Sequence, residues 1–117
     1  MRSTNGAARH KKHKKIMNRV SGFYQSRHKQ YRTARAAIKR AEQQAFIGRK
    51  LKKRDMRKLW ITRINIASRE LGVPYSRLMS GLTKAGITID RKQLSELAIH
   101  QPEAFKALVD QAVAANS

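Results

Sequence analysis

The sequence predicts an all-α protein, and three observations support this prediction. Strong helix formers dominate residues 25–71, a stretch that contains no proline and a single glycine. After Trp60, apolar residues recur three and four positions apart, which is the spacing of one helix face. Gly72 and Gly86 interrupt the second half at points where helices would end. We therefore expect a short basic helix, a long basic helical arm and a small compact C-terminal helical bundle.

The N-terminal segment predicts a tail followed by a short helix. Residues 1–9 contain Gly, Asn, Ser and Thr without apolar periodicity, so we expect an extended tail that is disordered when alone. Good helix formers from 10 to 20 carry Ile16, Met17 and Val20 on adjacent turns. Gly22 then supplies a stop, because glycine adopts the left-handed backbone of a helix end.

One long helix is expected from about Gln25 to Leu71. At about 1.5 Å per residue it would be roughly 70 Å long, which is more than a core built by this chain could cover. Gly48 is the position where we expect a bend or a break, because an uncapped helix longer than about 25 residues is unusual. Most of this helix must therefore contact something other than the chain itself.

The remaining sequence predicts a helical bundle. We expect a helix behind Ser76 as N-cap, a second behind a capping box that starts at Asp90, and a third opened by Pro102. Residues 87–89 have β-propensity, but without a partner strand we interpret them as a linker whose isoleucines fill the bundle. The predicted core residues are Trp60, Ile64, Ala67, Leu71, Tyr75, Leu78, Met79, Leu82, Leu94, Leu97, Ala98, Phe105, Leu108, Val109, Ala112 and Val113.

The charge is concentrated in the first half of the chain. The 117 residues include 27 Lys and Arg against 7 Asp and Glu, for a net charge of +20. Residues 1–60 hold 20 of these cations and only two acids, Glu42 and Asp55, which leaves +18 there. Such a segment repels itself unless a dense polyanion neutralises it. We therefore divide the chain into a basic tail and helical arm, 1–59, and a globular domain, 60–117.

Several function classes are disfavoured by composition. No apolar stretch of about 18 residues exists, so we expect neither a membrane span nor a secretory signal. The absence of cysteine excludes disulfides and thiolate chemistry. His10 and His13 have the spacing of a metal pair, but the surrounding cations oppose a dication. Glu96 and His100 form a candidate acid/base pair without a nucleophile or oxyanion-hole motif. We expect no enzymatic activity and no cofactor.

Seven cations between 49 and 58 indicate a nucleic-acid-binding helix. At about 100° per residue they spread around about 240° of its circumference, whereas a membrane-binding helix confines its cations to one face. A merely solvated face would include acids at i,i+4 spacing, and here Asp55 stands alone. The basic candidates are Arg9, His10, Lys11, Lys12, Lys14, Lys15, Arg27, Lys29, Arg32, Arg35, Lys39, Arg40, Arg49, Lys50, Lys52, Lys53, Arg54, Arg57 and Lys58.

Aromatic residues among these cations favour folded RNA over uniform duplex. Phe23, Tyr24 and Tyr31 are candidates for stacking on unpaired bases, and helix packing is the alternative for each. A histone-like DNA-organising protein would share the charge. Such a protein would be expected to have apolar wedges or a dimerisation surface, and neither is evident here.

Four strings go beyond composition. They are Arg9-His10-Lys11-Lys12, Lys53-Arg54-Asp55-Met56-Arg57-Lys58-Leu59-Trp60-Ile61-Thr62-Arg63-Ile64-Asn65, Tyr75-Ser76-Arg77 and Ile89-Asp90-Arg91-Lys92. By these strings the chain closely resembles the bacterial-type large-subunit ribosomal protein L-twenty family, from about Arg9 to Val113.

This resemblance implies a non-enzymatic protein that binds large-subunit ribosomal RNA directly and early in subunit assembly, beside neighbouring ribosomal proteins. It also implies that some members repress translation of their own messenger RNA. Because no transit peptide is evident, we expect a bacterial cytoplasmic ribosome over an organellar one. By the resemblance, Trp60 would anchor the arm to the bundle, Arg77, Arg91 and Lys92 would mark an RNA face on the bundle, and phosphates would be neutralised by Arg9, Lys11, Lys12, Lys53, Arg54, Arg57 and Arg63.

Overall fold

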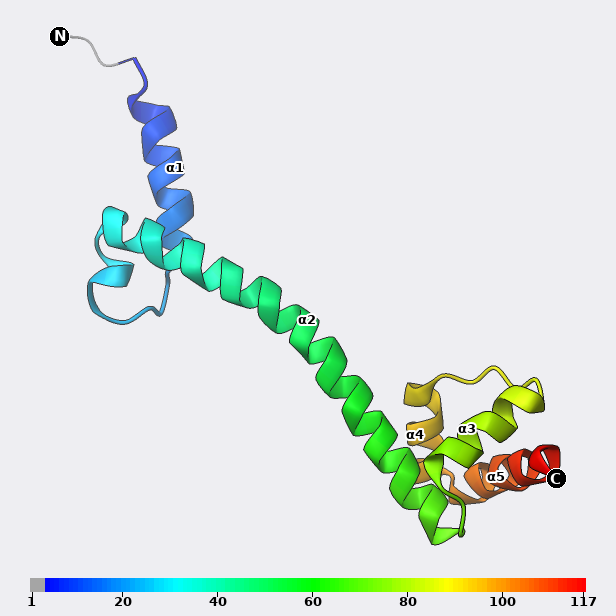
Figure 1. Cartoon of the computed structure of the whole chain (residues 1–117). Helices are drawn as coiled ribbons and strands as arrows, with labels where there is room; N and C mark the ends of the chain where they lie inside the picture. The colour runs from blue at the N-terminus through cyan, green and yellow to red at the C-terminus, as the bar shows by residue number, and fades with distance from the viewer. Residues whose placement is uncertain (1–3) are drawn as a thin grey trace. The chain divides into compact units, whose positions relative to one another are not determined.

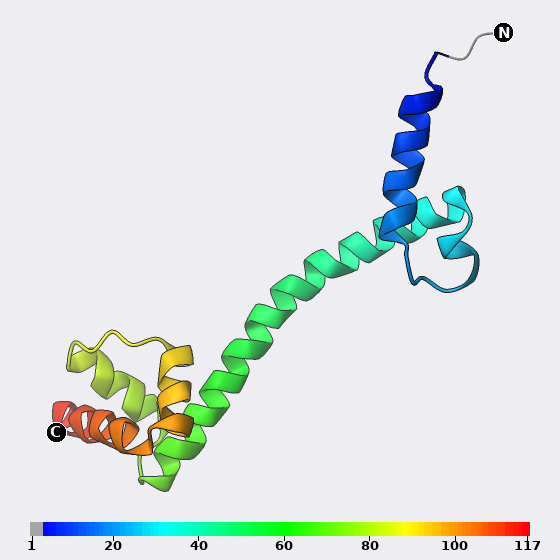
Figure 2. The same ribbon diagram turned by 180° about the vertical axis from the view of Figure 1, so that it is seen from behind.

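The computed structural model describes residues 4–117 and confirms the all-α prediction for that part of the chain (Figures 1 and 2). No helix within it is both long and apolar enough to cross a bilayer. The chain divides into two compact units, one ending at Lys50 and one spanning Leu51–Ser117. The helices are α1 (Gly6–Arg19), the 3-10 helix η1 (Gln25–His28), α2 (Tyr31–Glu70), α3 (Tyr75–Lys84), α4 (Arg91–His100) and α5 (Pro102–Asn116).

The N-terminal unit is built around a small apolar cluster where α1 meets the start of α2. Val20, Ala34 and Ile38 are buried there, and Ile16, Met17 and Phe23 pack against them. The chain leaves α1, loops through η1 and returns, so that the end of α1 lies beside the first turns of α2 (Figure 1). Gly22 has φ +87°, as expected of the helix stop.

Two predictions for this unit are wrong. The first helix begins at Gly6, so residues 6–9 are helical where an extended tail was expected, because Ala7, Ala8 and Arg9 are strong helix formers. Residues 1–3 of that expected tail lie outside the described part. The long helix begins at Tyr31 and not near Gln25, whose φ of +55° is incompatible with a helix. Reversing the chain at 21–30 buries apolar surface that one continuous helix would leave exposed.

α2 runs without interruption through Gly48, so the break considered there does not occur. A mid-helix glycine costs about 1 kcal/mol relative to alanine, which strong helix formers on both sides outweigh. Every residue from 39 to 55 is exposed to solvent. Within residues 4–117, no apolar face covers this part of α2, in agreement with the expectation from its length.

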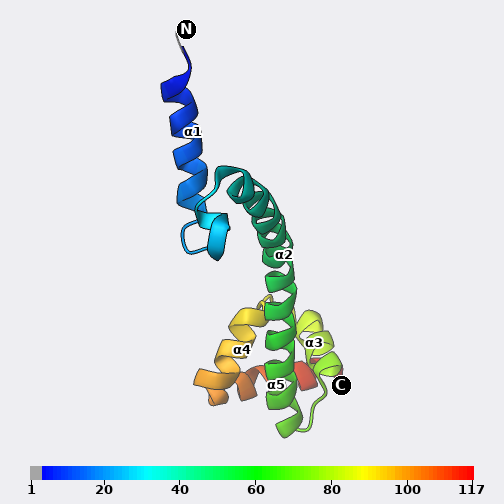
Figure 3. The same ribbon diagram turned by 90° about the vertical axis from the view of Figure 1, so that its left-hand side faces the viewer.

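The C-terminal unit packs the end of α2, α3, α4 and α5 around one core. Figure 3 shows α3 and α4 on either side of the end of α2, with α5 crossing behind. α3 and α5 approach closely where Gly81 of α3 lies directly against the backbone of Ala112. The buried core residues are Ile64, Leu78, Leu82, Leu94, Phe105, Val109 and Ala112.

Local signals set the helix ends of this unit. Asp90 caps α4, since its carboxylate accepts a hydrogen bond from the Gln93 backbone N–H at 2.7 Å. Pro102 opens α5 as expected. Ser76 is not an N-cap, because the extended residue before α3 is Pro74 and the helix begins at Tyr75.

The connections and outer faces complete the unit. At the end of α2, Gly72 has φ +82°, and the N–H groups of Gly72 and Val73 donate to the carbonyls of Arg69 and Ser68, the hydrogen bonds of a Schellman motif. Ile87 and Ile89 pack against the core from an irregular linker, as predicted. Two residues predicted in the core, Leu71 and Val113, are instead exposed, because Leu71 follows the last turn of α2 and Val113 lies on the outer face of α5.

Candidate nucleic-acid interface

The basic side chains of α1 form an open cationic surface. Arg9, His10, Lys11, Lys12, Lys14 and Lys15 are all exposed. His13 differs from them, since its ring stacks on Tyr31 with the ring centroids 3.7 Å apart and the planes 13° apart. This contact links α1 to the start of α2 and covers one face of Tyr31. Of the three stacking candidates, Tyr24 is the most open, with 76% of its surface exposed.

The cations along α2 are exposed in both units. In the N-terminal unit these are Arg32, Arg35, Lys39, Arg40, Arg49 and Lys50. Lys50 places its Nζ 4.6 Å from the centroid of the Phe46 ring, a cation–π contact that holds the ammonium beside the helix. In the C-terminal unit the exposed cations of α2 include Lys52, Lys53, Arg54, Arg57 and Lys58.

Almost none of this charge is neutralised within the chain. Across residues 4–117, Arg19 is the only Lys or Arg in an ion pair, with its guanidinium 2.7 Å from the Glu42 carboxylate. Glu96 and His100 also approach each other, with 3.1 Å between the carboxylate oxygen and Nε2, across one exposed turn of α4. This geometry is that of an ordinary i,i+4 surface pair. A solvated charged face would be laced with such pairs, and the basic helices are not.

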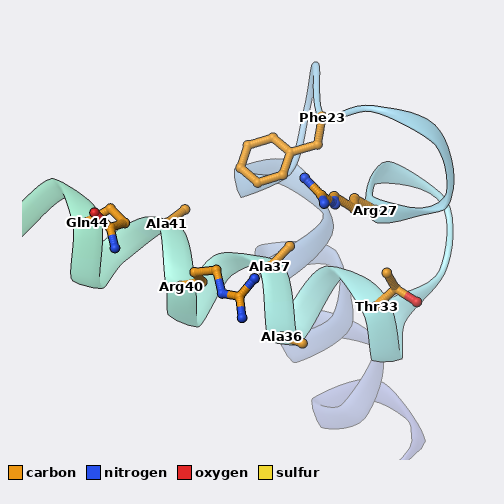
Figure 4. Close-up of a pocket in the computed structure, with 8 residues that line it drawn as sticks. All are labelled: Phe23, Arg27, Thr33, Ala36, Ala37, Arg40, Ala41 and Gln44. Atoms are coloured by element: carbon orange, nitrogen blue, oxygen red, sulfur yellow. The ribbon is translucent and has the colours of Figure 1, made fainter.

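A groove in the N-terminal unit brings together residues from the loop and from α2 (Figure 4). Its volume is about 450 Å³. Phe23 comes from the loop after α1 and Arg27 from η1, and α2 contributes Ala37 and Arg40 to the groove. The remaining lining residues are Thr33, Ala36, Ala41 and Gln44.

On the bundle, the residues expected to mark an RNA face differ in their surroundings. Arg77 and Lys92 are exposed, and the Arg77 carbonyl accepts a hydrogen bond from the Asn116 side chain at 2.8 Å. Arg91 is half-buried and donates from Nε to the Tyr75 hydroxyl at 2.8 Å, which joins the start of α4 to the start of α3. Arg63 and Trp60 are half-buried on α2.

Comparison with known proteins identifies the family of this fold. The family described as "Ribosomal protein L20" matches residues 2–108. The chain belongs to the ribosomal protein L20 family. Relatives named "Large ribosomal subunit protein bL20" include one from Rhizobium etli, 56% identical over 104 residues that cover 89% of this chain and 78% of the relative. The relative from Parvibaculum lavamentivorans is 52% identical over 110 residues, 94% of this chain and 93% of its own.

Membership of the L20 family confirms the resemblance seen in the sequence. The family is one of ribosomal structural proteins and not of enzymes, as expected. The identified relatives are bacterial.

Sequence reasoning missed the groove and two contacts of this L20-family chain. The groove was missed because residues 25–71 were interpreted as one helix, which would separate Phe23 from α2. A usable signal was present, since Ala34, Ala37 and Ala41 repeat small residues on one side of the helix. The contacts of His13 with Tyr31 and of Arg91 with Tyr75 join separate helices, and no local pattern specifies them.

Proposed function

We propose that this chain is a structural constituent of the large ribosomal subunit that binds large-subunit rRNA directly and promotes early subunit assembly. The observation that carries the proposal is unneutralised charge on exposed helices. Among residues 4–117, only Arg19 of the Lys and Arg side chains is ion-paired. The name of the relatives, large ribosomal subunit protein bL20, supports the same conclusion.

The proposed mechanism is electrostatic. RNA strands repel one another as they fold, and fixed cations on a helix replace diffuse counterions, whose release drives binding. Exposure of every residue from 39 to 55 allows phosphates to approach α2 from several sides. Such contacts fix position and supply affinity, and they carry little base specificity.

The proposal assigns different roles to the two parts of the chain. Residues 1–59 act as the rRNA-binding arm and residues 60–117 as the globular domain. On the globular domain, Arg77 and Lys92 are exposed and able to reach phosphates, and Arg91 is half-buried and donates a hydrogen bond to the Tyr75 hydroxyl. Exposed Ile66 and Ile99 provide apolar surface for neighbouring ribosomal proteins.

The proposal is tested by salt-dependent binding to a large-subunit rRNA fragment and to duplex DNA of equal length. The first variant replaces Lys52 and Lys53 by glutamine. The control variant replaces Lys84 and Lys106 by glutamine; both are also exposed but lie outside the predicted contacts. Both variants lose two lysines, so their net charge is identical.

We expect the Lys52/Lys53 variant to reduce the slope of log K against log salt by about 1.5, since each lost phosphate contact removes about 0.7–0.9. The control is expected to retain the original slope and the preference for rRNA. Equal slopes in the two variants would contradict the assignment of these contacts. Equal affinity for rRNA and DNA at every salt concentration would instead favour the histone-like alternative.

Repression of the chain's own messenger is part of the proposal only through the family resemblance. It is compatible with the ribosomal role because both require recognition of folded RNA. Binding of the full chain to its own transcript, in competition with the rRNA fragment, tests it. If the transcript binds through the same residues as rRNA, the rRNA fragment is expected to displace it. A transcript that does not bind at all would argue against repression.

A further inference from the structure

The groove of Figure 4 combines an apolar interior with a cationic rim. One wall is the Phe23 ring, which is half-buried and packs against the Val20 cluster. The opposite wall is the methyl surface of Ala37 and Ala41 on α2. An aromatic ring facing small apolar side chains leaves a slot that suits a flat group better than a bulky one.

The polar groups at this groove are cationic or neutral. Arg27 of η1 and Arg40 of α2, both exposed, contribute guanidinium groups, and no acid is among the lining residues. Gln44 adds an amide at one end, with donor and acceptor capacity for the edge of a base. The occupant indicated by this chemistry has an uncharged planar part and adjacent negative charge.

We propose that this groove binds a single unpaired RNA base, inserted between Phe23 and the Ala37/Ala41 surface, with Arg27 and Arg40 on the flanking phosphates. The inference rests on the proposed function and specifies a subsite within it. Glutamine pairs most readily with adenine among the four bases, so adenine is the best-matched occupant for Gln44.

The volume of the groove and the free-energy cost of opening a base pair both favour one unpaired base as the occupant. The volume of about 450 Å³ lies near the lower end of the range for ligand pockets, about 300–1,000 Å³. An α-helix of a partner protein, about 10–12 Å across with its side chains, would not enter the groove. A base that is already unpaired enters at the least cost, because no base pair has to open.

The experiment measures binding of the full chain to two short RNA hairpins at physiological salt. One hairpin has a single bulged adenosine, and the other has an abasic ribose at the same position. Both carry the same phosphates, so the ratio of their affinities isolates the contribution of the base. We expect the adenosine hairpin to bind about tenfold more tightly, as one stacked base provides.

Two variants locate the base in the groove. Ala41→Leu fills the slot with a good helix former, and is expected to bring the affinity ratio close to one. Ala45→Leu is the matched control, because it makes the same change one turn along α2 at an exposed position outside the lining. It is expected to preserve the tenfold ratio. Phe23→Leu keeps apolar volume against the Val20 cluster but removes the ring, and is expected to lower the ratio as well.

The outcomes separate this inference from the broader proposal. If both hairpins bind equally well and with steep salt dependence, the base subsite is refuted while electrostatic rRNA binding stands. If Ala41→Leu preserves the ratio, the base binds elsewhere and the groove assignment is wrong. If neither hairpin binds and the rRNA fragment does not bind either, the proposed function fails together with the subsite.

Discussion

Replacing Gly81 by alanine tests the packing that holds the C-terminal unit together. A Cβ at this position would lie 2.7 Å from the carbonyl carbon and 2.8 Å from the Cα of Ala112. Carbon atoms pack favourably at about 3.5–4.0 Å, so α3 and α5 would have to separate by about 1 Å. The obstructing atoms belong to the backbone, and no side-chain rotation relieves the contact.

The expected loss of stability follows from two opposing effects. Overpacking a core costs about 1–3 kcal/mol, and the backbone obstruction places Gly81→Ala near about 3 kcal/mol. The higher helix propensity of alanine offsets about 1 kcal/mol of this destabilisation. The net destabilisation is about 2 kcal/mol, which lowers the unfolding midpoint of a domain of this size by roughly 8–16 °C.

Thermal unfolding of the full chain, followed by the fluorescence of Trp60, measures this effect. Trp60 is the single tryptophan and belongs to the C-terminal unit. Gly48→Ala is the control, because a Cβ at Gly48 would meet nothing within 4 Å. Its midpoint is expected to be no lower than that of the wild type. A Gly81→Ala midpoint equal to or above the wild type, or an equal fall in both variants, would refute the packing argument.

Three further predictions concern the core, a helix cap and the arm. Ile64→Ala, at a fully buried position, is expected to cost about 2–5 kcal/mol in urea unfolding. Ile66→Ala, at a position with 57% exposure, is expected to stay within about 0.5 kcal/mol, and similar losses in both would contradict the core assignment. Asp90→Ala removes the bond to Gln93 and is expected to cost about 1 kcal/mol, which Asp90→Asn largely restores in the same assay. Because the charged arm repels itself when free, its helicity by circular dichroism is expected to rise on addition of the rRNA fragment, and free protein already at full bound helicity would oppose this.

Features with a local cause were predictable from the sequence. Asp90 and Pro102 act on the backbone of their own first turns, so their roles are independent of the rest of the fold. The core residue Ile64 was found because burial on one helix face leaves a period in the sequence. The concentration of cations was equally visible, since it depends on composition alone.

Features that depend on tertiary contacts were not predictable. Nothing in the residues around Gln25 opposes a helix strongly, and the chain reverses there because burial of Val20 against Ala34 and Ile38 favours the turn. The groove of Figure 4 was not predictable for the same reason, since its two walls face each other only after the chain reverses at 21–30. Likewise, Arg91 was expected to contact RNA, and its hydrogen bond to Tyr75 depends on how α3 and α4 pack.

The exposure of residues 39–55 also bears on the lifetime of copies that have not joined a ribosome. This stretch contains Lys39, Arg40, Arg49, Lys50, Lys52, Lys53 and Arg54, all exposed in the part of the chain that the structure describes. Backbone hydrogen bonds open readily in such a segment, and an opened segment is a substrate for proteases. Bound RNA would close these cleavage sites, so that limited trypsin digestion should cut the free chain here first and spare the complex. The same exposure that admits phosphates thus makes this stretch the part of the free chain that we expect to be most sensitive to proteases, and bound RNA the condition that protects it.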